Sequence, residues 1–148
     1  MHRFVASWFG SGLILRRLRG SDAGSGTVAS VVTLVIALLL HPFGWGVQLA
    51  AALAVTALAL WSAGPFAEGD PGWVVADEAA GMLWATIGLG GWAAVVAFVV
   101  FRVADITKRF PGVSEAERLP GALGVTADDI IAGLYGLAAG WALFAILA

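Results

Sequence analysis

The sequence has no cysteine and only two histidines, His2 and His41, among 148 residues. The absence of cysteine excludes disulfides, thiolate metal sites and a cysteine nucleophile. Charged residues are also scarce, at 12% of the chain against roughly a quarter in soluble domains, whereas hydrophobic residues make up 60%. So few charges cannot cover a water-exposed surface. We therefore expect one integral membrane domain spanning residues 1–148.

The net charge of −2 comes without a basic patch interleaved with aromatic residues, so we expect no nucleic acid partner. At the N-terminus, the apolar residues 4–15 are followed by three arginines rather than preceded by them. This order differs from that of a cleaved signal peptide and favours a short interfacial segment.

The formal charges are confined to four clusters. Three long stretches have none: residues 23–67, 79–101 and 130–148. The charged side chains lie between these stretches, at residues 3–22, 68–78, 102–118 and 128–129.

The first uncharged stretch is too long for one membrane span, which needs about 20 residues. Residues 41–46 read His-Pro-Phe-Gly-Trp-Gly, and their proline and glycines end a helix and turn the chain. The sequence therefore predicts a hairpin with helices near residues 27–40 and 47–63.

The second uncharged stretch contains Gly-Leu-Gly-Gly at residues 88–91. This run predicts a break between helices near residues 77–87 and 92–105, with a single continuous helix as the alternative. A last helix is expected over residues 127–147.

Two hairpins return the chain to the side that it entered, so all four charged clusters are expected at one membrane face. Arginine and lysine in these clusters make that face cytoplasmic by the positive-inside rule. A helix of 13 residues rises only about 20 Å, against a hydrocarbon core of about 30 Å, so the charged helix ends would lie at or below the headgroups.

The expected fold class is all-α: a polytopic membrane helical bundle with two short hairpins, interrupted helices and a final C-terminal helix. Its expected parts are an N-terminal interfacial segment with the first motif loop (1–26), a first hairpin (27–63), an acidic motif (68–81), a second hairpin (77–105), a loop (106–126) and the last helix (127–148).

Small residues recur in the last helix, with glycine at positions 133, 136 and 140. Such spacing is typical of closely packed membrane helices. We assign these glycines to packing and not to chemistry.

Ionisable side chains at membrane depth are costly, which makes them candidates for function. Asp77 and Glu78 begin one apolar helix, and Asp128 and Asp129 begin another. Either pair could also serve only as a helix cap.

A third charged group combines Arg102, Asp105 and Lys108, which follow one another at intervals of three residues and so share roughly one helix face. The alternative to a functional role is a salt bridge at the membrane edge.

Five carboxylates and two cations thus converge on one face, and this set suits phosphoryl chemistry. Oxygen ligands favour Mg²⁺, for which we expect ligands among Asp77, Glu78, Asp105, Asp128 and Asp129. Arginine and lysine can neutralise a transferring phosphoryl group. A carboxylate could act as a base towards water or as a nucleophile that forms an aspartyl-phosphate, and the residues leave both mechanisms open.

Four motifs, spread over nearly the whole chain, resemble those of bacterial phosphatidylglycerophosphatase A. They are Phe9-Gly-Ser-Gly12 with Gly26-Thr27; Asp70 through Asp77-Glu78 to Gly81; Phe101-Arg102-x-x-Asp105-x-x-Lys108-x-x-Pro111; and Gly121-x-x-Gly124-x-x-x-Asp128-Asp129-x-x-Ala132-Gly133.

The resemblance implies an inner-membrane enzyme of phospholipid biosynthesis that uses Mg²⁺. It would remove the terminal phosphate of its lipid substrate, phosphatidylglycerophosphate, to give phosphatidylglycerol. It implies catalytic or metal-binding roles for Asp77, Glu78, Asp105, Asp128 and Asp129. Substrate-binding roles fall on Arg102, Lys108, Gly12, Thr27 and Asp70.

Two other functions compete with this interpretation. A small transporter or channel subunit could use the acids as an ion or proton path, but no acid lies within the uncharged stretches and no inverted repeat is evident. A CDP-alcohol phosphatidyltransferase also uses magnesium in a membrane, but its Asp-Gly-x-x-Ala-Arg signature is absent from the sequence.

Overall fold

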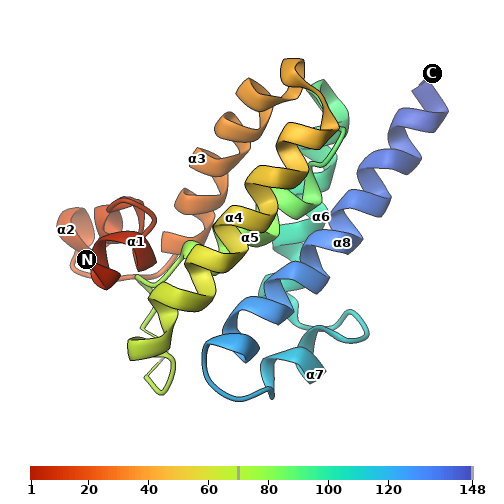
Figure 1. Ribbon diagram of the computed structural model, residues 1–148. Helices are drawn as coiled ribbons and strands as arrows, with labels where there is room; N and C mark the ends of the chain where they lie inside the picture. The colour runs from red at the N-terminus through yellow and green to blue at the C-terminus, as the bar shows by residue number, and fades with distance from the viewer. Residues whose placement is uncertain (70, 148) are drawn as a thin grey trace.

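The computed structural model describes residues 1–69 and 71–147, and in these ranges every regular element is helical, which confirms the all-α class. The α-helices are α1 (His2–Ala6), α2 (Ile14–Arg19), α3 (Ser25–Leu40), α4 (Trp45–Ala63), α5 (Ala76–Ala85), α6 (Gly91–Thr107), α7 (Val113–Glu117) and α8 (Ala122–Leu147). Figure 1 shows the long helices gathered around α5, with α1 and α2 to one side.

The first predicted hairpin is present as α3 and α4, joined by a 3₁₀ turn at His41–Phe43. Gly44 has φ of +91°, which favours glycine at the point where α4 begins. With their 3₁₀ extensions the two helices form apolar segments Ser25–Phe43 and Trp45–Phe66, of 19 and 22 residues. The expectation that both hairpins have short helices is therefore wrong for this one, because helical structure continues into the turns at their ends.

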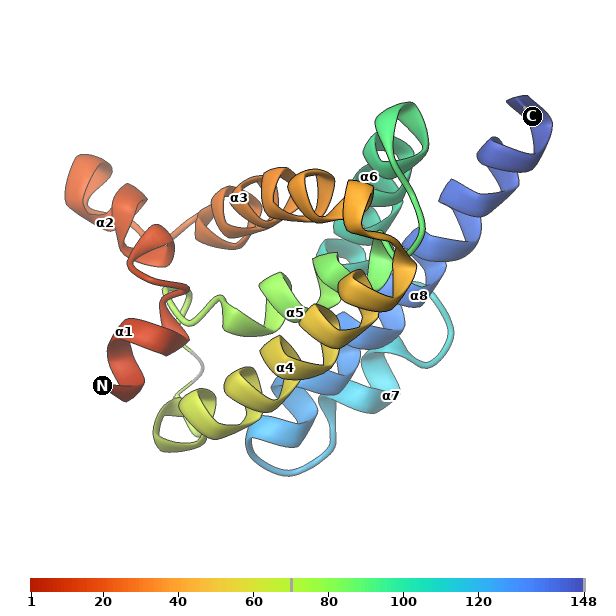
Figure 2. The same cartoon turned by 45° about the horizontal axis from the view of Figure 1, so that its top comes forward.

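Among the described residues, three segments are long and apolar enough to cross a membrane: these two and Ala122–Leu147. α6 has 17 residues, and α5 has only 10, about 15 Å of helix. α5 is almost entirely buried, packed against α3, α4, α6 and α8 (Figure 2). The second hairpin is thus unequal, with one short helix inside the bundle.

The predicted break between α5 and α6 is confirmed, and two neighbouring helices hold it in place. The backbone N–H of Gly88 donates to Gln48 Oε1 of α4 at 2.7 Å. The indole N–H of Trp141 in α8 donates to the carbonyl of Ile87 at 3.2 Å. These contacts fix where α5 ends along the axis of the bundle. Because α5 has 10 residues, they also fix where it begins.

The segment expected as a loop, residues 106–126, contains α7, and α8 begins at Ala122 rather than near residue 127. Gly121, with φ of +61°, turns the chain directly before α8. Asp128 and Asp129 consequently lie in the second turn of α8. The prediction that they begin the helix is wrong, and with it their interpretation as a cap.

Glycines let α8 approach its neighbours closely, as the sequence predicted. A Cβ atom on Gly136 would lie 2.5 Å from the carbonyl oxygen of Ala97 in α6. A Cβ atom on Gly133 would collide with the carbonyl oxygen of Gly81 in α5. The close contact of α8 with both helices depends on these missing side chains.

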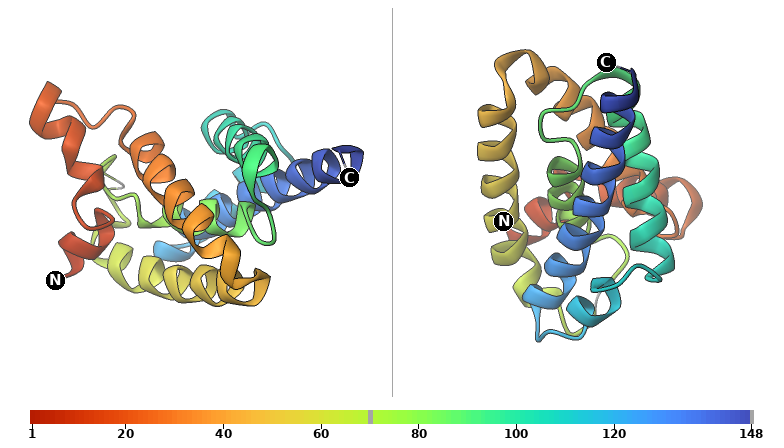
Figure 3. Two further views of the ribbon diagram at one scale, coloured as in Figure 1. Left: turned by 90° about the horizontal axis from the view of Figure 1, so that it is seen from above. Right: turned by 90° about the vertical axis from the view of Figure 1, so that its right-hand side faces the viewer.

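The two turns and the C-terminal end of α8 lie at one end of the bundle (Figures 1 and 3). α7, the beginning of α8 and the segment that leads into α5 lie at the other end. The N-terminal segment packs onto this second end, where the backbone N–H of Val75 donates to the carbonyl of Ala6 at 2.8 Å.

We expect Gly136→Ala to destabilise the protein, because the new methyl group meets the backbone of α6. Overpacking of this kind costs about 1–3 kcal/mol. Gly46→Ala is the matched control, since a Cβ atom at Gly46 meets nothing within 4 Å. Thermal unfolding in detergent should show a lower midpoint for Gly136→Ala only. Equal midpoints for the two variants would contradict the packing account.

Candidate functional site

Three carboxylates from α5 and α8 meet inside the bundle. Asp77 and Glu78 lie in the first turn of α5, and Asp129 faces them from α8. One oxygen of each side chain lies within 4.8 Å of those of the other two. Gly81 makes this possible, since a Cβ atom there would lie 2.5 Å from the carbonyl oxygen of Asp129.

Two of these carboxylates are buried and Glu78 is half-buried, and all three are incompletely hydrogen-bonded. Asp77 and Asp129 are 4% and 3% exposed. Asp77 Oδ1, Glu78 Oε2 and Asp129 Oδ1 have no hydrogen-bond partner in the described part of the chain. Isolated buried carboxylates are strongly unfavourable, so three of them together fit a bound cation. The residue before α5, Val75, makes no side-chain cap hydrogen bond, and the two acids lie in the first turn, where the helix dipole favours negative charge.

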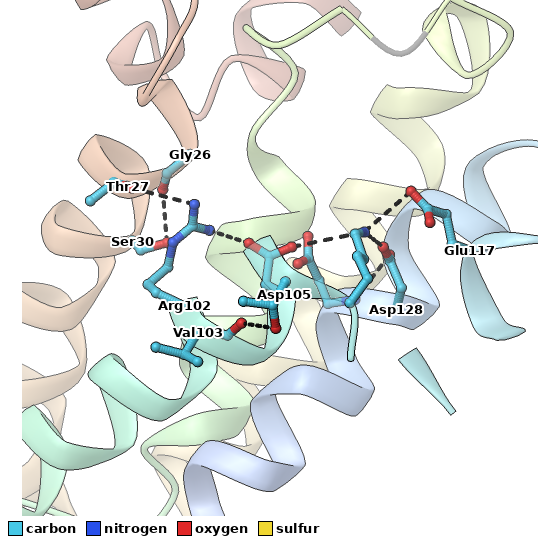
Figure 4. Close-up of polar contacts among 11 residues, drawn as sticks. Gly26, Thr27, Ser30, Arg102, Val103, Asp105, Glu117 and Asp128 are labelled. Atoms are coloured by element: carbon cyan, nitrogen blue, oxygen red, sulfur yellow. Dashed lines mark hydrogen bonds and ion pairs between the residues drawn. The ribbon is translucent and has the colours of Figure 1, made fainter. Parts of the chain in front are cut away.

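Lys108 is the centre of a second group of charges, whose acidic members Asp105, Glu117 and Asp128 are drawn in Figure 4. Its ammonium contacts Asp128 of α8, and it lies 3.3 Å from Glu117 of α7 and 3.9 Å from Asp105 of α6. Lys108 has φ of +53° and ends α6, so this junction adopts a backbone conformation that is uncommon for lysine.

Burial alone would lower the pKa of Lys108, but the hydrogen bond and charge of Asp128, with the charges of Asp129 and Asp105, raise it above its ordinary value. The side chain therefore remains a cation at neutral pH. It is 30% exposed, so it can still meet a ligand.

Arg102 lies on the other side of Asp105 and is 9% exposed. Its Nη1 lies 2.5 Å from Asp105 Oδ2, and its Nη2 donates to the hydroxyl of Thr27 in α3 at 3.4 Å. Its Nε is buried without a partner in the described chain. A Cβ atom at Gly26 would collide with the carboxylate of Glu78 and lie 3.1 Å from Arg102 Nη2, so a side chain there would displace both functional groups.

A cavity of about 130 Å³ opens between these groups. Its charged lining comes from α5, α6, α7 and α8 and from the residue directly after α6: Asp77, Glu78, Asp105, Lys108, Glu117, Asp128 and Asp129. A water molecule needs about 10–15 Å³ on the same measure. The cavity therefore has room for several waters, or for an ion with a phosphate group.

The structure thus brings together all five carboxylates and both cations that the sequence singled out. Thr27 joins them through Arg102, whereas Gly12 packs against the backbone of Trp73 and the side chain of Val75. Asp70 lies outside the described residues. Glu117 lines the cavity but was missed, because nothing in the sequence predicted that α7 returns it to Lys108.

The comparisons with known proteins agree with the motif resemblance. A family model described as phosphatidylglycerophosphatase A matches residues 4–144. A Bacteroides thetaiotaomicron protein with the provisional name phosphatidylinositol-3-phosphatase is 31% identical over 144 residues, which cover 88% of this chain and 86% of that protein. No solved structure matches the chain. The chain therefore belongs to the phosphatidylglycerophosphatase A family, phosphoric monoester hydrolases that act on a membrane lipid.

Proposed function

We propose that the protein is a Mg²⁺-dependent phosphatase of the bacterial cytoplasmic membrane that converts phosphatidylglycerophosphate and water to phosphatidylglycerol and inorganic phosphate. The observation that carries this proposal is the meeting of Asp77, Glu78 and Asp129 in one cavity with Lys108. Family membership supports the choice of lipid.

The five carboxylates divide into two sets by their contacts. Asp105 and Asp128 pair with Arg102 and Lys108. The other three have oxygens without partners, so Asp77, Glu78 and Asp129 would hold Mg²⁺. The bound ion would neutralise phosphate oxygens as negative charge shifts during hydrolysis. We assign Asp105 and Asp128 to orienting the two cations.

The two cations provide positive charge for the phosphates of the substrate. A phosphate monoester carries about −1.5 to −2 charge at neutral pH, which one divalent ion bound by three carboxylates cannot balance. Lys108 borders the cavity and keeps its charge, so it is suited to the terminal phosphate. Arg102 offers a planar fork of donors on the opposite side of Asp105.

Phosphate release from defined lipids tests the proposed activity. Purified protein in lipid nanodiscs should release phosphate from phosphatidylglycerophosphate when Mg²⁺ is present, and chelation should abolish the release. Phosphatidylinositol 3-phosphate is the comparison substrate, because the Bacteroides relative carries the name of that activity. Faster phosphate release from the inositol lipid would make that lipid the assigned substrate. No phosphate release from either lipid would contradict the proposed phosphatase activity.

Lys108→Met should reduce kcat for the lipid at least about tenfold, equivalent to about 1.4 kcal/mol of transition-state stabilisation. Arg109→Met is the matched control, because the neighbouring Arg109 is exposed and absent from the cavity lining. The substitution leaves Asp128 without its cation, so unfolding midpoints must accompany the rates. If the Lys108→Met protein is stable and has the normal rate, Lys108 serves only as the structural ion-pair partner of Asp128.

We further propose that the charged end of the bundle faces the cytoplasm, because arginine and lysine gather there. The chain has no cysteine, so single cysteines report accessibility directly. In cells, Arg109→Cys should resist a membrane-impermeant thiol reagent applied from outside. Gly46→Cys, at the turn between α3 and α4, should react. The reverse pattern would invert the orientation.

A further inference from the structure

An apolar groove lies between α3 and α6 on the outer face of the bundle. It has a volume of about 310 Å³ and is lined by Thr27, Phe98, Val99, Arg102, Val103 and Ile106, together with Thr107. α3 and α6 both pack against α5 (Figure 3, left). Val99, Val103 and Ile106 are 51%, 47% and 65% exposed, so their side chains are open to the surrounding lipid.

Arg102 links the groove to the candidate active site. This residue lines the groove, and its guanidinium pairs with Asp105, which lines the charged cavity. The groove is therefore followed by Arg102, then by Asp105 (Figure 4), and then by Lys108, which lines the cavity together with the carboxylates. A molecule that reaches from the groove into the cavity needs an apolar part in the groove, one anionic group at Arg102 and a second anionic group at Lys108.

Arg102 itself indicates the nature of the first anionic group. It is nine-tenths buried, and its Nε has no partner in the described chain although Nη1 and Nη2 are occupied. A buried donor without a partner is costly, and a phosphate oxygen is a strong acceptor for an arginine fork.

A second apolar depression on the surface of the bundle differs from this groove in its lining. It lies on α8, has the same volume of about 310 Å³, and is lined by Ile131, Leu134, Tyr135 and Ala138. It has no charged residue in its lining. The α3–α6 groove, in contrast, combines an apolar wall with the buried cation of Arg102.

We propose that the α3–α6 groove binds an acyl chain of the lipid substrate, and that Arg102 binds the phosphodiester next to the diacylglycerol. The terminal phosphate then lies beyond Asp105, in the cavity with Lys108 and the carboxylates. This inference rests on the proposed function for the terminal phosphate. It adds that the lipid enters sideways from the bilayer, between α3 and α6.

Filling the groove tests the acyl-chain site. Val99→Trp and the more exposed Ile106→Trp should each raise KM for long-chain phosphatidylglycerophosphate at least about fivefold, because the indole occupies the space of the chain. Their kcat values, and their rates with a water-soluble short-chain analogue, should stay within about twofold of wild type. Leu134→Trp is the matched control, since it fills the α8 depression and Leu134 is 46% exposed.

If neither groove variant differs from Leu134→Trp with the long-chain lipid, or both lose the short-chain activity equally, the groove is not the acyl-chain site. An acyl-chain diazirine analogue of the substrate gives a test that needs no turnover. It should label residues 98–107 more than residues 131–138, and equal labelling would overturn the proposal. A wild-type protein that is labelled in the groove but hydrolyses neither lipid would contradict the proposed function and leave the groove standing.

Discussion

Five carboxylates share one end of a bundle whose interior is otherwise made mainly of apolar and small side chains, and their charge must be balanced where they are buried. Two of them are balanced inside the protein, because Asp105 pairs with Arg102 and Asp128 contacts Lys108. The other three, Asp77, Glu78 and Asp129, keep oxygens without partners. In the proposed function, the negative charge that remains on these three residues would attract a cation and, through it, phosphate.

The helix packing is arranged around this charge balance. α5 is only 10 residues long, so its first turn places Asp77 and Glu78 inside the bundle rather than at its surface. Glycines at 26 and 81 let α3 and α8 close on that turn, since a side chain at either position would meet Glu78 or the backbone of Asp129. Small residues commonly allow close packing of membrane helices, and here these two glycines also set the distances between the charged side chains of α5, α6 and α8.

Much of this arrangement could be predicted from the sequence. The clustering of charges between uncharged stretches gives the hairpins, and a hairpin brings its ends together, which is why the five carboxylates were correctly grouped. The start of α8 could not be predicted in the same way, because an apolar helix continues through Asp128 and Asp129 when neighbouring groups offset their charge. Glu117 depends on how α7 packs, and the division of carboxylates into paired and unpaired sets depends on side-chain directions that spacing does not fix.

Titration of the purified protein with Mg²⁺ in nanodiscs, followed by calorimetry, tests the central claim that α5 and α8 together hold a divalent cation. The account predicts saturable binding by the wild-type protein and affinity at least about tenfold weaker, about 1.4 kcal/mol, for Asp129→Asn. Glu117→Gln should bind as the wild type does, because Glu117 lines the cavity but its half-exposed side chain lies by Lys108 and outside the three-carboxylate cluster. Unchanged Mg²⁺ affinity in a folded Asp129→Asn protein would contradict the claim.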